Sequence, residues 1–336
     1  MIEARWYEKD EDQKVRCFLC HHHCLIKEGQ RGLCWVRENR QGTLYSLVYG
    51  KPIARHIDPI EKKPLFHFLP GSASYSIATL GCNFRCLFCQ NADISQARET
   101  KTIFGEELTP EEIITDVLGS PCKSISYTYT EPTIFLEYAQ DIAVLASAQG
   151  LKNVFVSNGY MTPEALESIH PHLHAANVDL KAFREEFYKT QCKAKLAPVL
   201  ESLKILKRMG VWVEVTTLII PTLNDSREEL KELARFISEE LGPETPWHIS
   251  RYHPTYRLTD LPITPVKTLQ QAWEIGKEQG LRYVYTGNVP GDQGEKTLCY
   301  HCGHLLLDRY GFSILKNNLQ DGKCPQCQTP MDGVGL

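Results

Sequence analysis

The chain has three segments that differ in their pattern of apolar positions. Between residues 70 and 290, short apolar runs alternate with segments whose apolar residues recur at helical spacing, which predicts strands alternating with helices. The predicted strands are 75–80, 124–128, 153–157, 175–180, 211–220, 247–251 and 282–285. The predicted helices are 110–118, 133–148, 163–169, 198–209, 226–240 and 265–279. This alternation requires parallel pairing through right-handed crossovers, so we expect an α/β fold, a partial (βα)6 barrel.

Several predicted helices begin with a threonine followed by proline, as at Thr109-Pro110 and Thr162-Pro163. Proline is favourable there because the first turn of a helix does not use its N–H. These pairs support the predicted helix starts.

The two flanking segments are short, and each carries four cysteines, so we expect neither to build an independent core. Such segments need a metal or another cross-link to fold. We therefore expect three domains: residues 1–69 as an N-terminal four-cysteine metal module, residues 70–290 as the barrel, and residues 291–336 as a C-terminal zinc-ribbon-like module.

Composition indicates an ordinary globular protein, with 336 residues, 42% hydrophobic residues and a net charge of -4. The charge gives no reason to expect nucleic-acid binding. Most of the thirteen cysteines are closely spaced, which favours metal binding in a reducing compartment over disulfides. The first fourteen residues are charged, and no apolar run approaches the ~20 residues of a membrane span. We expect a cytoplasmic protein.

Cys82, Cys86 and Cys89 form a C-x3-C-x2-C triplet directly after the first predicted barrel strand. Three thiolates on one loop suit three irons of a [4Fe-4S] cluster and leave the fourth iron open to a chelating small molecule. A zinc knuckle normally needs four ligands, and no fourth cysteine or histidine lies near the triplet in sequence. The triplet therefore predicts a site-open cluster.

The spacing of the triplet, the preceding strand and Phe88 resemble the radical S-adenosylmethionine (SAM) superfamily. The resemblance implies that the open iron binds the methionine amine and carboxylate of SAM. It also implies that one electron cleaves the sulfonium and produces a 5′-deoxyadenosyl radical. A reducing electron donor of the flavodoxin or ferredoxin type is then required.

Polar residues follow several predicted strands, at the end of a parallel barrel where ligands bind. Glu131 is a candidate partner of the SAM amino group, and Ser157 and Asn158 are candidates for the ribose hydroxyls. The alternatives are a helix-start carboxylate favoured by the dipole for Glu131 and an ordinary Asn-Gly turn for the other two.

Asp179 and Lys181 lie two residues apart, on one side of the fourth predicted strand. The Asp-Leu-Lys string also occurs in glycyl-radical-enzyme activases, which this chain resembles here and which have glycine where it has Thr222. We expect Asp179, Lys181 and His253 to be catalytic or to position SAM. A local salt bridge and a structural histidine are the alternatives.

Two further cysteine groups are candidate metal sites. The C-terminal group has the spacing C-x2-C-x21-C-x2-C, which is typical of a zinc ribbon, with an auxiliary iron–sulfur cluster as the alternative. It consists of Cys299, Cys302, Cys324 and Cys327. For the N-terminal group, zinc and a second cluster both fit. That group consists of Cys17, Cys20, Cys24 and Cys34.

Taken together, these motifs resemble the AmmeMemoRadiSam-system radical SAM enzymes, relatives of pyruvate formate-lyase activase. The resemblance implies Memo-like and Amme-type partner proteins. We favour a radical enzyme that acts on a small molecule. An activase that abstracts hydrogen from a glycine of a partner protein is the alternative, and a zinc-ribbon adaptor without enzymatic activity is a third.

Overall fold

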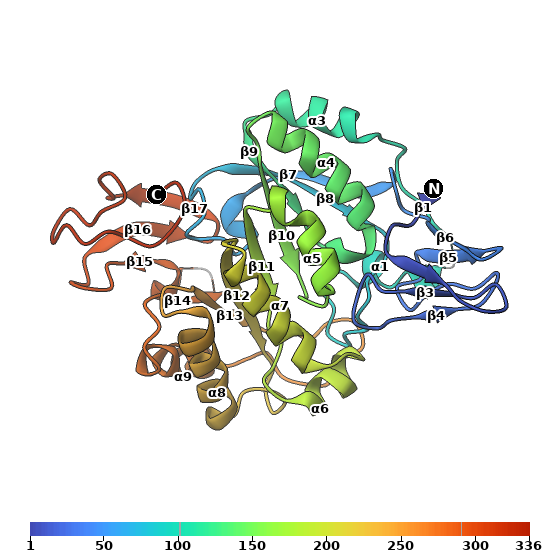
Figure 1. The fold of residues 1–336 in the computed structure, drawn as a ribbon. Coiled ribbons are helices and arrows are strands. Elements are labelled where there is room, and N and C mark those ends of the chain that lie inside the picture. Colours follow the sequence, from blue (N-terminus) through green and yellow to red (C-terminus); the bar gives the residue numbers. More distant parts are fainter. Residues whose placement is uncertain (101, 290) are drawn as a thin grey trace.

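The centre of the protein is an eight-stranded sheet, seen in a computed structural model that describes residues 1–100, 102–289 and 291–336 (Figure 1). The spatial order of its strands, β14-β13-β12-β11-β10-β9-β8-β7, follows their order in the chain. Seven neighbouring strands are parallel. They are β8 (Ala73–Thr79), β9 (Cys122–Tyr127), β10 (Lys152–Ser157), β11 (Ala175–Asp179), β12 (Trp212–Ile219), β13 (Trp247–Arg251) and β14 (Val284–Gly287). Most of their residues are buried, as expected for parallel strands covered on both faces.

Each of the six connections between successive parallel strands contains a helix of at least seven residues. The helices are α3 (Pro110–Leu118), α4 (Leu136–Ala148), α5 (Pro163–Ile169), α7 (Leu196–Arg208), α8 (Arg227–Phe236) and α9 (Val266–Glu278). Six strand–helix units followed by β14 confirm the predicted α/β fold with a parallel sheet. Because the strands are parallel, their carboxyl ends gather at one end of the sheet, where the predicted ligand groups lie.

The eighth strand, β7 (Pro52–Pro59), pairs antiparallel with β8 at the edge of the sheet. After the short 3-10 helix η1 (Ile60–Lys62), the backbone N–H groups of Phe66 and His67 donate to the buried carboxylate of Glu214 on β12, at 3.0 and 2.8 Å. Residues 52–67 are thus built into the sheet, although they precede the predicted boundary at residue 69. The division into three domains stays a prediction.

The two cysteine-rich ends lie at opposite sides of the sheet (Figure 1). The N-terminal end forms two three-stranded sheets and the C-terminal end a third. The N-terminal strands are β1 (Ile2–Glu3), β2 (Tyr7–Lys9), β3 (Val15–Cys17), β4 (Leu25–Ile26), β5 (Arg37–Arg40) and β6 (Thr43–Ser46). The C-terminal strands are β15 (Thr297–Leu298), β16 (Leu305–Tyr310) and β17 (Ser313–Asn317).

Short helical turns account for most differences from the predicted elements. The first turn of the predicted helix 133–148 is the 3-10 helix η2 (Pro132–Phe135), whose N-terminus is capped by the Glu131 side chain. The short helices α1, α2 and α6 and the π-helix η4 were not predicted, because they have fewer residues than a periodic pattern needs. They span Ala92–Ser95, Ala97–Thr100, Glu185–Phe187 and Tyr188–Cys192.

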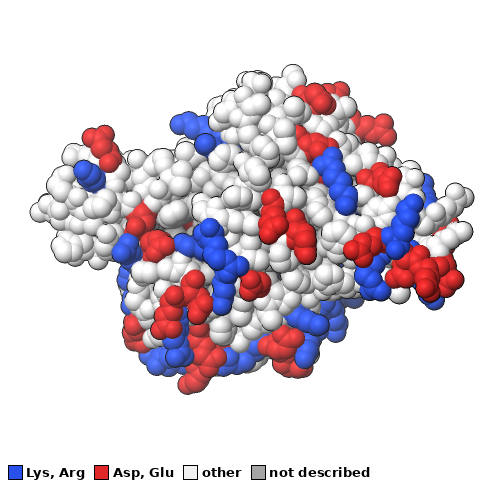
Figure 2. Space-filling model, in the orientation of Figure 1, with Lys and Arg blue, Asp and Glu red and all other residues white. Residues whose placement is uncertain are grey.

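On the face drawn in Figure 2, acidic and basic side chains are interspersed, with no large patch of one sign. None of the helices in the described ranges has the length and apolar character needed to cross a bilayer.

Thr222 lies in the loop after β12 with a φ of +69°. This left-handed conformation costs a residue with a Cβ about 1–2 kcal/mol relative to glycine. Thr222 is exposed, so its side chain contributes little packing. We expect Thr222→Gly to raise the thermal midpoint of unfolding by about 2 °C, because relief of strain exceeds the extra chain entropy of glycine.

Asn288→Gly is the control. Asn288 also has a positive φ, but its amide donates to Ser250 Oγ, so loss of that bond should lower the midpoint. A lower midpoint for Thr222→Gly would contradict the strain.

Candidate active site

The triplet cysteines lie on the loop that follows β8. Gly81 begins this loop with a φ of +106°, and a Cβ at this position would lie 2.7 Å from Val36 Cγ1 and 3.0 Å from the Cys34 carbonyl oxygen. Only glycine fits so close to the N-terminal segment. The three thiols that follow are free, and Cys82 Sγ accepts from the Phe84 N–H at 3.4 Å.

The loop is fixed by backbone contacts from two directions. The N–H groups of Arg85 and Leu87 donate to carbonyls of η4, at 2.9 and 3.0 Å. The Leu87 carbonyl accepts from the N–H of Arg257, at 2.9 Å. These bonds hold the three thiols in place without using the sulfur atoms.

The surroundings of the thiols favour a cationic group between them. Burial, with the nearby Glu131 carboxylate second, raises the pKa of Cys82, and burial raises the pKa of Cys89. Contact with the Cys192 thiol, followed by burial, raises the pKa of Cys86. Thiolates in such a place need positive charge, which the irons of a cluster supply. The Asn83 Nδ2 beside Cys82 is buried and has no partner among the described residues, as fits a ligand site. The residues present therefore fit a [4Fe-4S] cluster.

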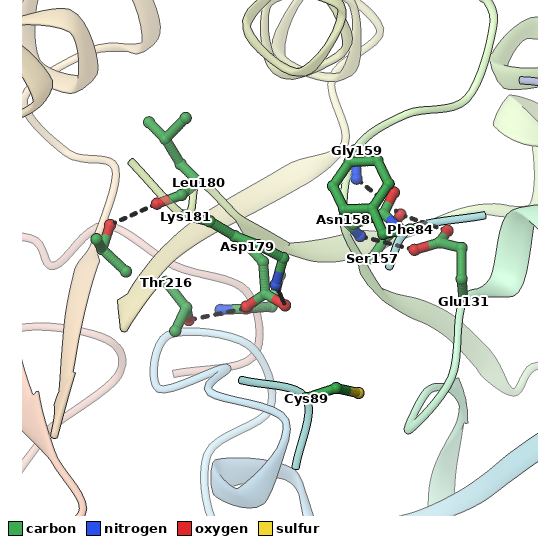
Figure 3. Close-up of polar contacts among 12 residues, drawn as sticks. Phe84, Cys89, Glu131, Ser157, Asn158, Gly159, Asp179, Leu180, Lys181 and Thr216 are labelled. Atoms are coloured by element: carbon green, nitrogen blue, oxygen red, sulfur yellow. Dashed lines mark hydrogen bonds and ion pairs between the residues drawn. The ribbon is translucent and has the colours of Figure 1, made fainter. Parts of the chain in front are cut away.

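Glu131 joins the ends of β9 and β10 to each other (Figure 3). Its Oε1 accepts from Thr133 Oγ1, the Thr133 N–H and Ser157 Oγ, at 2.6, 3.1 and 2.8 Å. Its Oε2 accepts from the Asn158 N–H at 2.8 Å. Burial raises the pKa of Glu131, and these bonds oppose that rise. Since Oε2 accepts only one of these bonds, it retains a lone pair for a further donor.

Asn158 connects this group to the triplet. Its Nδ2 donates to Asn83 Oδ1 at 2.7 Å and lies 3.9 Å from Cys82 Sγ. The turn continues through Gly159, where a Cβ would lie 2.8 Å from Val178 Cγ1 on β11. The Asn-Gly turn is thus both a close-packed turn and a neighbour of the cysteine loop.

Asp179 and Lys181, at the end of β11, form the salt bridge that was the alternative reading, with Lys181 Nζ 2.9 Å from Asp179 Oδ2 (Figure 3). Lys181 also faces the triplet. Burial alone would lower its pKa, but the Asp179 carboxylate and the Cys86 thiol raise it. The Lys181 ammonium lies 5.9 Å from the ring centre of Phe88 on the cysteine loop. The ion pair therefore adjoins the candidate cluster.

His253 follows β13 and is exposed. The hydrogen bonds that join the triplet loop to Asn158, η4 and Arg257 do not involve His253. Its role stays a prediction, as do the cofactor and catalytic roles of the other candidate residues.

Two side chains at this site were not predicted. Cys192 in η4 is fully buried beside Cys86, and His22 reaches the cysteine loop, with Nε2 2.8 Å from the Asn83 carbonyl oxygen. Both residues are far from the triplet in the sequence, so no local motif could have predicted these contacts.

The C-terminal cysteines form a compact group, with all four sulfurs within 4.8 Å of one another. Two of the sulfur pairs are 3.6 Å apart. Four sulfurs placed tetrahedrally at about 2.3 Å from one zinc ion are about 3.8 Å apart. The group therefore has the dimensions of a site for a single metal ion.

We predict zinc at this group. Replacing Cys299 and Cys302 together with serine should remove one zinc per chain and make residues 291–336 sensitive to protease, because metal binding supplies the folding energy of such a module. The measurements are metal content by mass spectrometry and limited proteolysis. His301→Ala, in the same loop, is the control and should retain zinc. Unchanged zinc in the double variant, or iron with sulfide in this group, would contradict the assignment.

The N-terminal cysteines Cys17, Cys20, Cys24 and Cys34 line one cavity together with Arg37. This arrangement brings together the four thiols that the sequence predicted as ligands, and it places them next to the Gly81 end of the triplet loop.

Comparisons with known proteins agree with this geometry. Residues 76–237 match the model of the Radical SAM superfamily. The chain is 49% identical over 336 residues to "Uncharacterized protein MJ0808" of Methanocaldococcus jannaschii, covering 99% of this chain and 100% of that protein. It is 27% identical to the pyruvate formate-lyase-activating enzyme of Clostridium pasteurianum over 54% of this chain and 80% of that enzyme.

A solved structure has a similar fold. The radical SAM methyltransferase from Sphaerobacter thermophilus aligns with a TM-score of 0.51 and 16% identity, over 68% of this chain and 71% of that one. The site geometry, the superfamily match and the full-length relative lead to one conclusion: the chain is an enzyme of the radical SAM superfamily, in one family with the Methanocaldococcus protein.

Proposed function

We propose that the enzyme cleaves SAM reductively at a [4Fe-4S] cluster held by Cys82, Cys86 and Cys89, and abstracts hydrogen from a small-molecule substrate. One observation carries the proposal: Asn83 on the triplet loop accepts from Asn158 after β10, whose N–H donates to Glu131 after β9, and Lys181 after β11 lies 5.9 Å from the ring centre of Phe88. When bound, the cluster supplies the electron that cleaves SAM into methionine and a 5′-deoxyadenosyl radical.

In this proposal the protein holds and orients SAM. Glu131 Oε2 has a lone pair for the SAM amino group, and its other hydrogen bonds fix its direction. Ser157 and Asn158 donate to the same Glu131 carboxylate, and their short polar side chains suit the ribose hydroxyls of SAM. The Lys181 ammonium places a positive charge beside Cys86, and Asp179 holds that ammonium. His253, which is exposed after β13, is proposed as a further catalytic or SAM-positioning group.

A small substrate is favoured because the cysteine loop is contacted from several sides. The N-terminal segment, η4 and residue Arg257 all bond to it. This leaves less room for a segment of a partner protein. The second candidate, a glycyl-radical activase, is favoured by the similarity to the Clostridium activating enzyme.

Isotope transfer separates these two candidates. We expect deuterium from the true substrate, a metabolite of low mass, to appear in 5′-deoxyadenosine when reduced enzyme is incubated with SAM. Mass spectrometry of 5′-deoxyadenosine measures the transfer. Incubation with a Memo-like protein serves as the parallel experiment. A stable glycyl doublet in electron paramagnetic resonance, with no transfer from a metabolite, would overturn the small-molecule route in favour of the activase.

The proposal includes a reducing donor of the flavodoxin or ferredoxin type, Memo-like and Amme-type partners, and a cytoplasmic location. The free state of all thirteen cysteines supports a reducing compartment. Co-purification with tagged Memo-like protein tests the partner.

A further inference from the structure

The four N-terminal cysteines line a single cavity whose other walls are mainly apolar. Leu19, Ile26 and Ile134 contribute to these walls, and the Arg37 side chain reaches the same cavity. Cys17 and Cys24 are brought together by the β3–β4 hairpin, in which the Cys17 N–H donates to the Cys24 carbonyl at 2.9 Å. The thiols therefore converge from a folded scaffold.

The spacing of these sulfurs differs from that of the C-terminal group. Among the described residues, only the C-terminal cysteines have their sulfurs all within 4.8 Å of one another. The N-terminal group and the triplet both exceed that spacing. Four irons and four sulfides stand between the thiolates of a cubane cluster, so its cysteine sulfurs lie farther apart than those around one ion. The N-terminal group, like the triplet, therefore lacks the compact single-ion spacing of the C-terminal group.

Arg37 brings to this cavity N–H donors that are unpaired within the described ranges. It is 1% exposed, and its Nη2 donates to the buried carboxylate of Glu137 at 2.5 Å. Its Nε and Nη1 have no partner among the residues that the structure describes. Buried N–H groups normally donate to an acceptor. Two such donors beside four thiols suit the sulfur atoms of a cluster with net negative charge.

The N-terminal cysteine loops also contact the triplet loop directly. His22 Nε2 lies 2.8 Å from the Asn83 carbonyl oxygen, and the Arg85 guanidinium donates to the Leu33 carbonyl. The Cys34 carbonyl packs against Gly81, the neighbour of Cys82. A group bound by the N-terminal cysteines is therefore a close neighbour of a group bound by the triplet.

We propose that Cys17, Cys20, Cys24 and Cys34 hold a second [4Fe-4S] cluster, which passes one electron to the cluster on the triplet. The second cluster is oxidised by one electron as the triplet cluster is reduced, and no bond forms or breaks in this step. A low-potential one-electron donor protein then reduces the second cluster again. The relay rests on the proposed function, whereas the identity of the cluster does not.

Metal and sulfide analysis of the full-length protein, purified without oxygen, tests the cluster. We expect about eight irons and eight sulfides per chain in the wild type. The Cys82→Ala, Cys86→Ala, Cys89→Ala triple variant should keep about four irons and show a paramagnetic cluster signal after reduction. Cys122→Ala, which alters a buried thiol outside all three groups, should keep the full iron content.

About four irons and two zinc ions per wild-type chain would overturn the second cluster, and this result needs no variant. The numbers of irons, sulfides and zinc ions per chain do not depend on SAM cleavage. The second cluster and the proposed function can therefore fail separately.

Rates with two kinds of reductant test the relay. The Cys20→Ala, Cys24→Ala variant should form 5′-deoxyadenosine several-fold more slowly than the wild type when a ferredoxin-type protein is the donor. With dithionite, a small reductant that can reach the triplet cluster directly, the two rates should differ much less. Equal rates with the protein donor would overturn the relay.

Discussion

Replacing Cys82, Cys86 and Cys89 together with alanine should abolish SAM cleavage, reducing 5′-deoxyadenosine formation at least about 10³-fold, to the level seen without enzyme. The three thiols are the only protein ligands proposed for this cluster, and the hydrogen bonds that fix their loop use backbone groups. The loop should therefore keep its shape while losing its cluster. Chromatography of anaerobic reactions reduced with dithionite measures the product.

Cys122→Ala is the matched control for this change. Cys122 is a buried free thiol at the start of β9, the opposite end of the sheet from the candidate site. It should retain both iron and product formation. Undiminished product in the triple variant would remove the triplet from the chemistry altogether.

The second large effect is expected for Glu131→Gln, which should lower kcat/KM for SAM about 100-fold. The carboxylate accepts four hydrogen bonds, from Thr133, Ser157 and Asn158. In glutamine, an NH2 group replaces one of the two carboxylate oxygens and would face the donors of Thr133, Ser157 or Asn158. The loss of one charge-assisted hydrogen bond, worth about 1.5–3 kcal/mol, accounts for a change of this size. Initial rates at several SAM concentrations give the value.

Thr133→Val serves as the comparison, since it removes one donor to Oε1 and leaves the carboxylate charge intact. We expect a loss of less than about tenfold for this variant. Both variants should bind as much iron as the wild type. Equal losses in the two variants would mean that Glu131 acts only by tying the two strand ends together.

The parallel sheet and its helices were predictable because their signals are local. Apolar runs, Thr-Pro helix starts and the three-cysteine spacing each fall within a few residues, so the seven parallel strands and the triplet were located in advance. Placing polar groups at strand ends followed from the rule that parallel strands share one ligand-binding end. The position of Glu131, Asn158 and Lys181 beside the cysteine loop agrees with that rule.

The remaining features depend on pairings between distant segments. β7 joins the sheet by pairing with β8, although its sequence lies in the segment that we assigned to a separate metal module. Cys192 meets Cys86 because η4 packs on the cysteine loop, more than a hundred residues away in the chain. Contacts of this kind arise from the tertiary fold and have no periodicity that a single sequence displays.

Thr222 illustrates how the structure explains a departure noted in the sequence. The resemblance to activases predicts glycine at this position, and the positive φ of Thr222 is the conformation that glycine adopts most easily. The N–H of Thr222 donates to Asp225 Oδ1 at 2.9 Å, which helps to hold threonine in that conformation.

Binding of SAM to the triplet cluster is the central claim, and magnetic resonance tests it most directly. Reduced wild-type enzyme should be examined by electron–nuclear double resonance with SAM carrying ¹⁵N in its amino group and ¹⁷O in its carboxylate. We predict hyperfine coupling of both nuclei to the cluster, and loss of both couplings together with the cluster signal when the triplet is replaced in a Cys20→Ala, Cys24→Ala background. A reduced cluster on the triplet that shows no coupling to either nucleus at saturating SAM would contradict the account.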